Sequence, residues 1–554
     1  MADRRASLAD AVATHVRPGD ALHLAVGHTR WSAAAREIVR QWWGRDPGFT
    51  LVMLSLSSLG ALFFRGGLVR HVITGYSGDT FPNFTPNPVF VRAYETGEVT
   101  VEHWSFLAFA QRLEAAARGL PAITTRSIAG SSMADNDGFA LAASPFGEVG
   151  LLAPLVPDVA VLHAPVADRD GNVAVEPPLL EGTWGALAAR RGAIVTVERV
   201  VDDLRPWSHL VRIPGHRVLA VVEAPFGAHP GGIFVRDLPV DGYGEDYEFW
   251  MQARDATRSD AYDEWIDRWV LGVADQETYL DRLGGERRDR LRARAAPDSW
   301  QADDQPVDDT TAANRWEQAA VYAARHVAER VRAIAADAVL AGAGVANLAA
   351  WVGVGLAREE GAEVTLTAEI GMWGYEPVPA DPFVLNHRNF WRSTLLTDAS
   401  TVLGGLVASP GTTTLACLGA AQIDRHGNVN TTRTADGRFL VGSGGGNDVA
   451  SVATEVVVVA TLHPERTPAT LGYVTSPGDA VGALVTDLGI LERDATGELV
   501  LSAVPTGPGG VDAAVAACGW DLRVASSVRE LSPPTPAELD ALRRFDPEGF
   551  LLRA

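Results

Sequence analysis

Cysteine, long apolar runs and positive charge are all scarce in this chain of 554 residues. The two cysteines, Cys417 and Cys518, exclude a disulfide framework and a cysteine-rich metal site, and their apolar neighbours predict buried thiols. No apolar stretch reaches the ~20 residues that a membrane-spanning helix requires. The first residues are charged and lack the apolar core of a secretory signal, so we expect a cytoplasmic protein without a membrane partner.

Basic residues number 47 against 69 acidic ones, which gives a net charge of −22. That balance excludes nucleic acid and anionic membrane surfaces as natural partners and is typical of a soluble protein. Neither a His-x-x-x-His pair nor a paired cysteine motif indicates a metal. The length exceeds what one hydrophobic core supports, so we expect at least two domains.

An internal repeat is the most informative feature that is present. The segment APVADRDGNVA at Ala164–Ala174 returns as AAQIDRHGNVN at Ala420–Asn430, with six of eleven positions identical. Both copies follow an apolar run and end in Asp-Arg-x-Gly-Asn. This pattern predicts a buried strand that enters a tight turn, where Gly or Asn adopts a positive φ. Such a turn is as compatible with a purely structural role as with a ligand contact.

Two further pairs of segments extend the repeat in the same order. Asp20–Gly27 matches Asp337–Gly344, and Phe49–Leu54 matches Val364–Glu369. Each first member reads as a strand that an apolar helix follows; in the first half that helix is expected from Ser32, acting as its cap, to Trp43. Short apolar strands that alternate with helices predict an α/β fold with mainly parallel sheets.

The composition along the chain predicts where the repeated units begin and end. Residues 1–285 form the first expected domain, with a helical tail from about residue 246. Residues 286–314 are polar, charged and without a strand pattern, and are interpreted as a linker. The second expected domain, 315–554, opens with a long alanine-rich helix at Arg315.

The two units differ where their second strands end. The alignment places the apolar Leu54 opposite the carboxylate of Glu369, which enters an apolar loop interrupted by glycines. Burying a carboxylate there is costly unless it serves a purpose. A salt bridge at the strand end is the structural alternative, and spacing alone does not decide between the two.

The residues around Glu369 resemble a known family. EIGMWGYEPVP at Glu369–Pro379 is similar to the Glu-x-Gly loop of family I coenzyme A transferases, and VGSGGGNDVAS at Val441–Ser451 is similar to their glycine run. Further similarity lies in Leu462–Gly478 and Val221–Gly232. The likeness is greatest to the glutaconate-type and steroid-ring-degrading members. It implies two tandem open α/β domains of the NagB/RpiA/CoA-transferase-like type, with the α and β subunits fused in that order.

The resemblance also implies a mechanism. Glu369 would attack an acyl-CoA thioester and pass through an acyl-glutamyl anhydride and a glutamyl-CoA thioester. The residues expected at the oxyanion or CoA site are Gly444, Gly445, Gly446 and Gly27; taken alone, the glycine run would be read as a plain turn. Coenzyme A thioester and a small carboxylic acid would be substrates, with no permanently bound cofactor and no metal, and by analogy the chain would form a homodimer.

Two alternatives remain open. Some steroid-ring-degrading relatives are hydrolases of a CoA thioester or of a carbon–carbon bond in a cyclic β-dicarbonyl CoA ester. The catalytic Glu of their α chain aligns near Phe106 here, and Glu102 is displaced by about one helical turn. The other alternative is a non-catalytic CoA-binding protein, which Glu369 and the glycine run disfavour.

Overall fold

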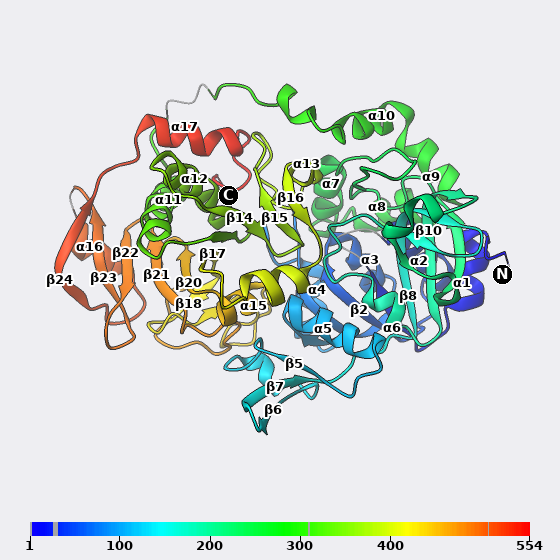
Figure 1. Cartoon of the computed structure of the whole chain (residues 1–554), viewed down its shortest axis with the longest axis horizontal. Helices are drawn as coiled ribbons and strands as arrows, with labels where there is room; N and C mark the ends of the chain where they lie inside the picture. Colours follow the sequence, from blue (N-terminus) through cyan, green and yellow to red (C-terminus); the bar gives the residue numbers. More distant parts are fainter. Residues whose placement is uncertain (1–2, 26–30, 308–310, 508, 554) are drawn as a thin grey trace.

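The computed structural model describes residues 3–25, 31–307, 311–507 and 509–553. The chain forms two α/β halves that lie side by side, each built around its own large sheet (Figure 1). Gly27, one of the residues expected at the CoA site, lies outside the described residues.

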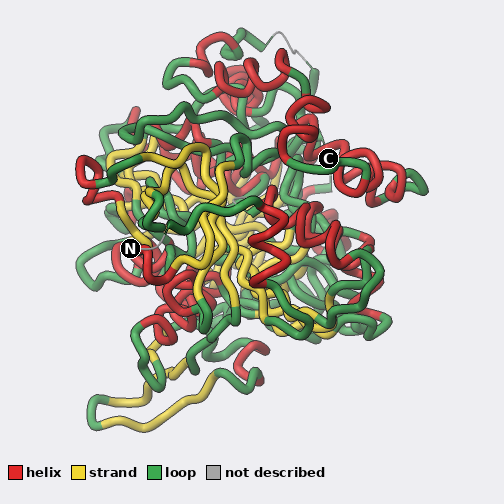
Figure 2. Tube along the Cα trace, turned by 90° about the vertical axis from the view of Figure 1, so that its right-hand side faces the viewer, coloured by secondary structure: helices red, strands yellow, loops and turns green. Residues whose placement is uncertain are grey.

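The first half centres on parallel strands in the order β4-β3-β2-β1-β8-β10-β12, and the short antiparallel strands β9 and β11 extend it beyond β8. A small antiparallel sheet in the order β5-β7-β6 projects from the body as an arm (Figure 2). The strands are β1 (Ala21–Leu24), β2 (Phe49–Leu56), β3 (Val69–Ser77), β4 (Thr100–His103), β5 (Ile123–Thr125), β6 (Phe139–Ser144), β7 (Gly147–Leu152), β8 (Val159–Asp168), β9 (Val173–Ala174), β10 (Gly192–Val201), β11 (Val211–Ile213) and β12 (Val218–Glu223).

Helices cover both faces of this sheet because its strands are apolar on both sides. On one face lie α1, α2 and the aromatic-rich tail, and on the other lie α5 and α6. The helices are α1 (Leu8–His15), α2 (Ser32–Trp42), α3 (Ala61–Arg65), α4 (Pro88–Glu95), α5 (Phe106–Ala117), α6 (Trp184–Ala188), α7 (Tyr247–Thr257), α8 (Tyr262–Ile266), α9 (Gln276–Leu283) and α10 (Gly285–Arg294).

The second half has the sheet order β16-β15-β14-β13-β17-β20-β21-β22-β23-β24, and its central strands β14, β13, β17, β20 and β21 are parallel. The strands β18 and β19 form a separate small pair. The strands are β13 (Ala338–Ala341), β14 (Thr365–Ala368), β15 (Met372–Tyr375), β16 (Ser393–Leu396), β17 (Thr414–Gly419), β18 (Gln422–Ile423), β19 (Val429–Asn430), β20 (Glu455–Val459), β21 (Val481–Thr486), β22 (Gly489–Arg493), β23 (Leu499–Pro505) and β24 (Val524–Leu531).

The long helix expected at Arg315 is confirmed as α11, and its start is set by a capping box. The Asn314 side chain accepts from the backbone N–H of Glu317, and Glu317 accepts from the backbone N–H of Asn314. α11 packs with α12 and α17 on one face of the second sheet, while α15 and α16 lie on the other. The helices are α11 (Arg315–Ala333), α12 (Val345–Glu359), α13 (His387–Trp391), α14 (Ala399–Thr401), α15 (Gly446–Val452), α16 (Gly510–Ala517) and α17 (Pro536–Phe545).

The strand registers confirm that one fold is built twice. Ala21 lies opposite Thr50 in the first half, and Ala338 lies opposite Thr365 at the matching point of the second. The registers of the next strands match as well: β10 shifts against β12 directly after Ala193, and β20 shifts against β21 after Val456, its counterpart. The order β2-β1-β8-β10-β12 therefore corresponds to β14-β13-β17-β20-β21.

One expected local feature is wrong. Ser32 does not cap α2: it is the first residue of the helix, after Trp31 at the cap position, and the cap has no side-chain hydrogen bond. The backbone of a distant loop takes over part of that role, because the N–H of Ala33 donates to the carbonyl of Gly227 at 2.9 Å. Long-range structure here overrides a local sequence signal.

The segment 286–314 includes most of α10 and runs across both halves (Figure 1). It is docked through ion pairs: Arg294 meets Asp381 at 2.6 Å, and Asp303 meets Arg388 at 2.8 Å. The indole N–H of Trp391 donates to the Ala295 carbonyl at 2.9 Å. This stretch therefore packs against the second half instead of hanging between the two.

Candidate active site

Glu369 occupies the turn of a hairpin that distinguishes the second half from the first. The chain turns back after β14, so that Ala368 pairs with Met372 in the antiparallel strand β15. Gly371 makes this turn possible: its φ is +112°, and a Cβ atom there would overlap the carbonyl group of Thr397. The Thr397 N–H in turn donates to the Gly371 carbonyl at 2.8 Å.

Leu54 stands at the equivalent position of the first half. There β2 runs on to Leu56, and the chain passes through α3 to the parallel strand β3. Leu54 is buried in an apolar cluster with Tyr76 and Phe106. The structure thus supports the alignment of Leu54 with Glu369, and it shows that a hairpin replaces a strand–helix–strand connection at this point.

The glycine run lies directly against Glu369. The backbone N–H of Gly445 donates to the Glu369 carboxylate, and a Cβ at Gly445 would overlap its Oε2 atom. The other two predicted donors are already used. The N–H of Gly444 donates to the Gly75 carbonyl at 2.9 Å, and the N–H of Gly446 donates to the Ser443 carbonyl at 3.1 Å.

The carboxyl group of Glu369 has an altered acidity. Desolvation raises its pKa to about 7, and the negative charge of Asp448 adds to this rise, while the hydrogen bond from Gly445 opposes it. Asp448 is itself fully buried, and desolvation raises its pKa to about 6. Near neutral pH, two neighbouring carboxyl groups therefore titrate in the same range.

Both halves build the site. Residues 441–444 lie beside the end of β3, where the N–H of Ser77 donates to the Val441 carbonyl at 2.7 Å. A first-half loop covers the other side of the hairpin turn. In that loop the N–H of Leu180 donates to the carbonyl of Ile370 at 3.2 Å, directly beside Glu369. The nucleophile candidate therefore lies at the seam between the halves.

The sequence reasoning missed Asp448. It follows the glycine run by two residues, and a carboxylate in an apolar context is the signal that could have singled it out. Its partners Ser105 and Leu107 belong to the first half, more than 300 residues away in the chain, and no local pattern connects them.

The repeated turns have the same internal structure in both halves. Asp168 accepts from the backbone N–H of Asn172 at 2.9 Å, and Asp424 accepts from that of Asn428 at 3.0 Å. Each Asn side-chain oxygen then accepts from the N–H of a glycine in a later loop, at 2.9 Å in both cases. These contacts favour a structural role for the turns.

The residues considered for the hydrolase alternative are arranged differently. Phe106 is buried at the start of α5, and its N–H donates to the Gly444 carbonyl at 3.1 Å, so an apolar ring stands beside the glycine run. Glu102 forms an ion pair with Arg112 at 2.9 Å and also accepts from the Trp104 indole. The structure thus gives Glu102 structural partners on its own half.

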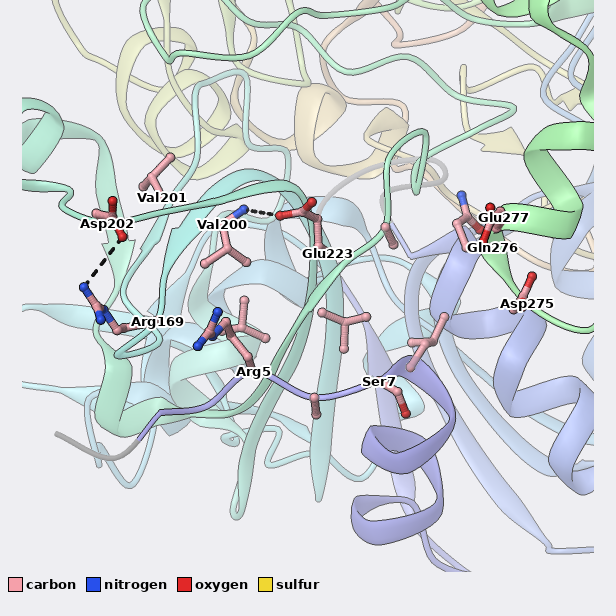
Figure 3. A pocket seen from close by; sticks show the side chains of 15 residues that line it. Arg5, Ser7, Arg169, Val200, Val201, Asp202, Glu223, Asp275, Gln276 and Glu277 are labelled. Atoms are coloured by element: carbon pink, nitrogen blue, oxygen red, sulfur yellow. Dashed lines mark hydrogen bonds and ion pairs between the residues drawn. The ribbon is translucent and has the colours of Figure 1, made fainter.

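Other parts of the described chain offer less chemistry. A groove of 590 Å³ lies at the edge of the first sheet, between the N-terminal segment, β12 and the start of α9, and Arg5, Glu223 and Gln276 are among its lining residues (Figure 3). None of the predicted site residues lines it. Within the described ranges, no cluster of three or more His, Cys, Asp or Glu side chains is arranged for a metal ion. No helix there combines the length and apolar character needed to cross a bilayer.

Comparison with known proteins identifies the family. Residues 5–224 match the family model described as Coenzyme A transferase. The 3-oxoadipate CoA-transferase of Pseudomonas knackmussii consists of two kinds of subunit, and both match. The chain is 32% identical to one of them over 50% of its own length and 97% of that subunit. It is also 32% identical to the other, over 23% of this chain and 57% of that second subunit.

Two further comparisons extend the match. An uncharacterized protein of Archaeoglobus fulgidus is 32% identical over 53% of this chain, and the chain spans 65% of that protein. The structure of an acyl-CoA transferase of Escherichia coli O157:H7, a thioester complex with CoA, has the same fold. It covers 96% of this chain and 95% of its own, with a TM-score of 0.65 and 16% identity. With the family model, the near-complete match to one 3-oxoadipate CoA-transferase subunit and the duplicated fold, the chain belongs to the coenzyme A transferase family.

Proposed function

We propose that this protein transfers coenzyme A from an acyl-CoA to a small carboxylic acid, with Glu369 as the nucleophile. The observation that carries the proposal is the contact between Glu369 and Gly445, in which a carboxylate at a hairpin turn faces a backbone N–H that only glycine can bring so close. Desolvation of the carboxyl group makes it a better nucleophile than a hydrated carboxylate.

The first half-reaction has two steps. An oxygen of the Glu369 carboxylate attacks the thioester carbonyl carbon, and the carbon–sulfur bond breaks to give an acyl-glutamyl anhydride and CoA thiolate. The thiolate then attacks the glutamyl carbonyl carbon of the anhydride. The donor leaves as a carboxylate, and a glutamyl-CoA thioester remains.

The second half-reaction repeats these steps with the acceptor. Its carboxylate attacks the glutamyl thioester, which releases CoA thiolate and forms a new anhydride. The thiolate attacks the acceptor's acyl carbon, so the products are the new acyl-CoA and the free carboxylate of Glu369. No net proton transfer and no external oxidant or reductant are needed.

The N–H of Gly445 is our candidate oxyanion donor. It donates to the Glu369 carboxylate in this structure, so it is aimed at the oxygens that carry charge as the glutamyl carbonyl is attacked. Gly444 and Gly446 support it indirectly, because their N–H groups hold the loop to Gly75 and Ser443. Gly27 remains a predicted CoA contact.

We further propose that residues 1–285 act as the α-like half and residues 315–554 as the β-like half that supplies Glu369, with 286–314 connecting them. The docked α10 and the hydrogen bonds across the seam support one joint site built by one chain. A homodimer also remains a proposal, which light scattering on the purified protein would check.

Mass spectrometry tests the mechanism. After incubation with acyl-CoA alone, the peptide that contains Glu369 should carry a CoA adduct, and acyl transfer should need an acceptor acid. Glu369→Gln should abolish the adduct. Glu376→Gln is the matched control, because Glu376 lies just after the same hairpin and pairs with Arg358 at 2.9 Å outside the site. A hydrolase would instead release CoA, or a ring-opened product, without any acceptor acid.

A further inference from the structure

Helix α15, which follows the glycine run, reaches across the seam with its two consecutive polar residues. The Asn447 side-chain oxygen accepts from the backbone N–H of Ile128 at 2.8 Å, and its amide donates to the Thr475 carbonyl at 3.0 Å. Asp448 reaches toward α5. Both side chains are fully buried, so the first half holds this short helix through two adjacent side chains, one neutral and one acidic.

Asp448 is surrounded by donors. Its Oδ1 accepts from the Ser105 hydroxyl at 2.5 Å, and its Oδ2 accepts from the Leu107 backbone N–H at 2.9 Å. The Ser127 hydroxyl and the Ala108 N–H add further hydrogen bonds. An acidic side chain of the second half thus supplements the Ser105 cap at the start of α5.

The same residue lies next to the proposed nucleophile in both senses that matter. Along the chain, Asp448 is three positions from Gly445, whose N–H contacts Glu369, so a displacement of Asp448 is transmitted to that contact. Through space, its charge acts on the Glu369 carboxyl. The donors around Asp448 come from the first half, so the geometry of this pair depends on how the two halves are joined.

We propose that Asp448 is a positioning residue that holds the glycine run on Glu369 and, by its negative charge, sets the pH range in which Glu369 is ionised. The inference rests on the proposed function, since it assigns a role in the same site. Asp448 does not contact the substrate in this scheme. It acts through Gly445 and through the electrostatic field at Glu369.

The charged groups around the pair are few within the described residues. On Glu369, the charged group that acts is Asp448. The ionisable side chains of α5 pair elsewhere: Arg112 with Glu102 at 2.9 Å, and Glu114 with Arg118 at 2.7 Å. The remaining contacts of Asp448 are neutral hydroxyl and backbone N–H groups. Removing its charge should therefore act mainly on Glu369.

The experiment compares two neighbouring substitutions. Asp448→Asn removes the charge and keeps a side chain that can still accept from Leu107, whereas Asn447→Ala loosens the seam without changing any charge. The rate of CoA adduct formation on Glu369 is measured in single-turnover experiments from pH 5 to pH 9, with circular dichroism to check folding. For the wild type we expect an acid limb near the pKa of Glu369, about 7.

In Asp448→Asn the acid limb should move about 0.5–1 pH unit to lower pH, because a like charge beside Glu369 is gone while desolvation remains. In Asn447→Ala the plateau should fall while the limb stays in place. If Asp448→Asn shows a lower plateau and an unmoved limb, as Asn447→Ala does, Asp448 is merely structural and the inference is wrong.

A second variant covers the case in which Asp448→Asn does not fold. Ser105→Ala removes a hydroxyl donor that lowers the pKa of Asp448, so a larger fraction of Asp448 is neutral near pH 6. The acid limb should again move to lower pH, by a smaller amount, and an unmoved limb contradicts the inference. A wild type that forms no adduct at any pH would instead contradict the proposed function.

Discussion

Glu369 and Gly445 are in contact across the active-site turn: the Gly445 N–H donates to the Glu369 carboxylate, and there is no room for a side chain between them. One partner ends a strand and the other precedes a helix, and they are brought together by the packing of β14 against the glycine run. The contact makes the site sensitive to a single added methyl group.

Gly445→Ala should reduce transferase activity by about 100-fold or more, because the added Cβ displaces the Glu369 carboxylate and the N–H that serves it. Gly446→Ala is the matched control: a Cβ there meets nothing closer than the Ser476 hydroxyl at 3.6 Å, an ordinary contact. Steady-state assays of both variants check this. Equal activities would show that the contact is not needed.

Activity should fall as the pH drops through about 7, because the nucleophile must be ionised and desolvation raises the pKa of Glu369 to that value. The profile of kcat/KM against pH for a donor acyl-CoA measures this directly. An acid limb near 4.5, the ordinary value for a glutamate, would mean that the carboxyl group is hydrated in the working enzyme.

Replacing the nucleophile should stabilise the fold in alkaline solution. The folded protein binds a proton at Glu369 more tightly than the unfolded chain does, so the wild type loses stability as the pH rises from about 4.5 to about 7. We therefore expect Glu369→Gln to raise the free energy of unfolding by about 1–3 kcal/mol at pH 8, with little gain at pH 4. Denaturant titrations at both pH values test this, with Glu376→Gln as a control that changes little at either.

Asp424→Ala should lower the free energy of unfolding by about 2–4 kcal/mol, because three hydrogen bonds to the backbone and side chain of the repeated turn are lost. The KM for acyl-CoA should stay unchanged. Asp436→Ala, in an exposed turn, is the control and should change stability by about 0.5 kcal/mol or less. A raised KM with unchanged stability would indicate that the turn contacts CoA.

The repeated architecture could be predicted from the sequence because its anchors are local. Apolar strands and turn residues report their own conformation, so matching Asp20–Gly27 to Asp337–Gly344 found the correct strand registers. The cap expected at Ser32 failed for the opposite reason. The N–H of Ala33 is satisfied by Gly227, and no neighbouring residue announces that contact.

The candidate site was predictable only in part. Glu369 and the glycine run stand out because a buried carboxylate and clustered glycines are unusual in themselves. Which glycine faces the carboxylate is a matter of packing between distant segments, and the structure selects Gly445 over Gly444 and Gly446. Asp448 was missed because its donors come from the other half.

The hydrogen bonds across the seam have a mechanical consequence. Main-chain bonds join Ser77 to Val441, Gly75 to Gly444 and Leu180 to Ile370, as if the seam were part of a sheet. Rotating one half against the other would break these bonds around the nucleophile itself. The two halves should therefore move as a single body, and cutting the peptide backbone between them should leave two fragments that stay associated.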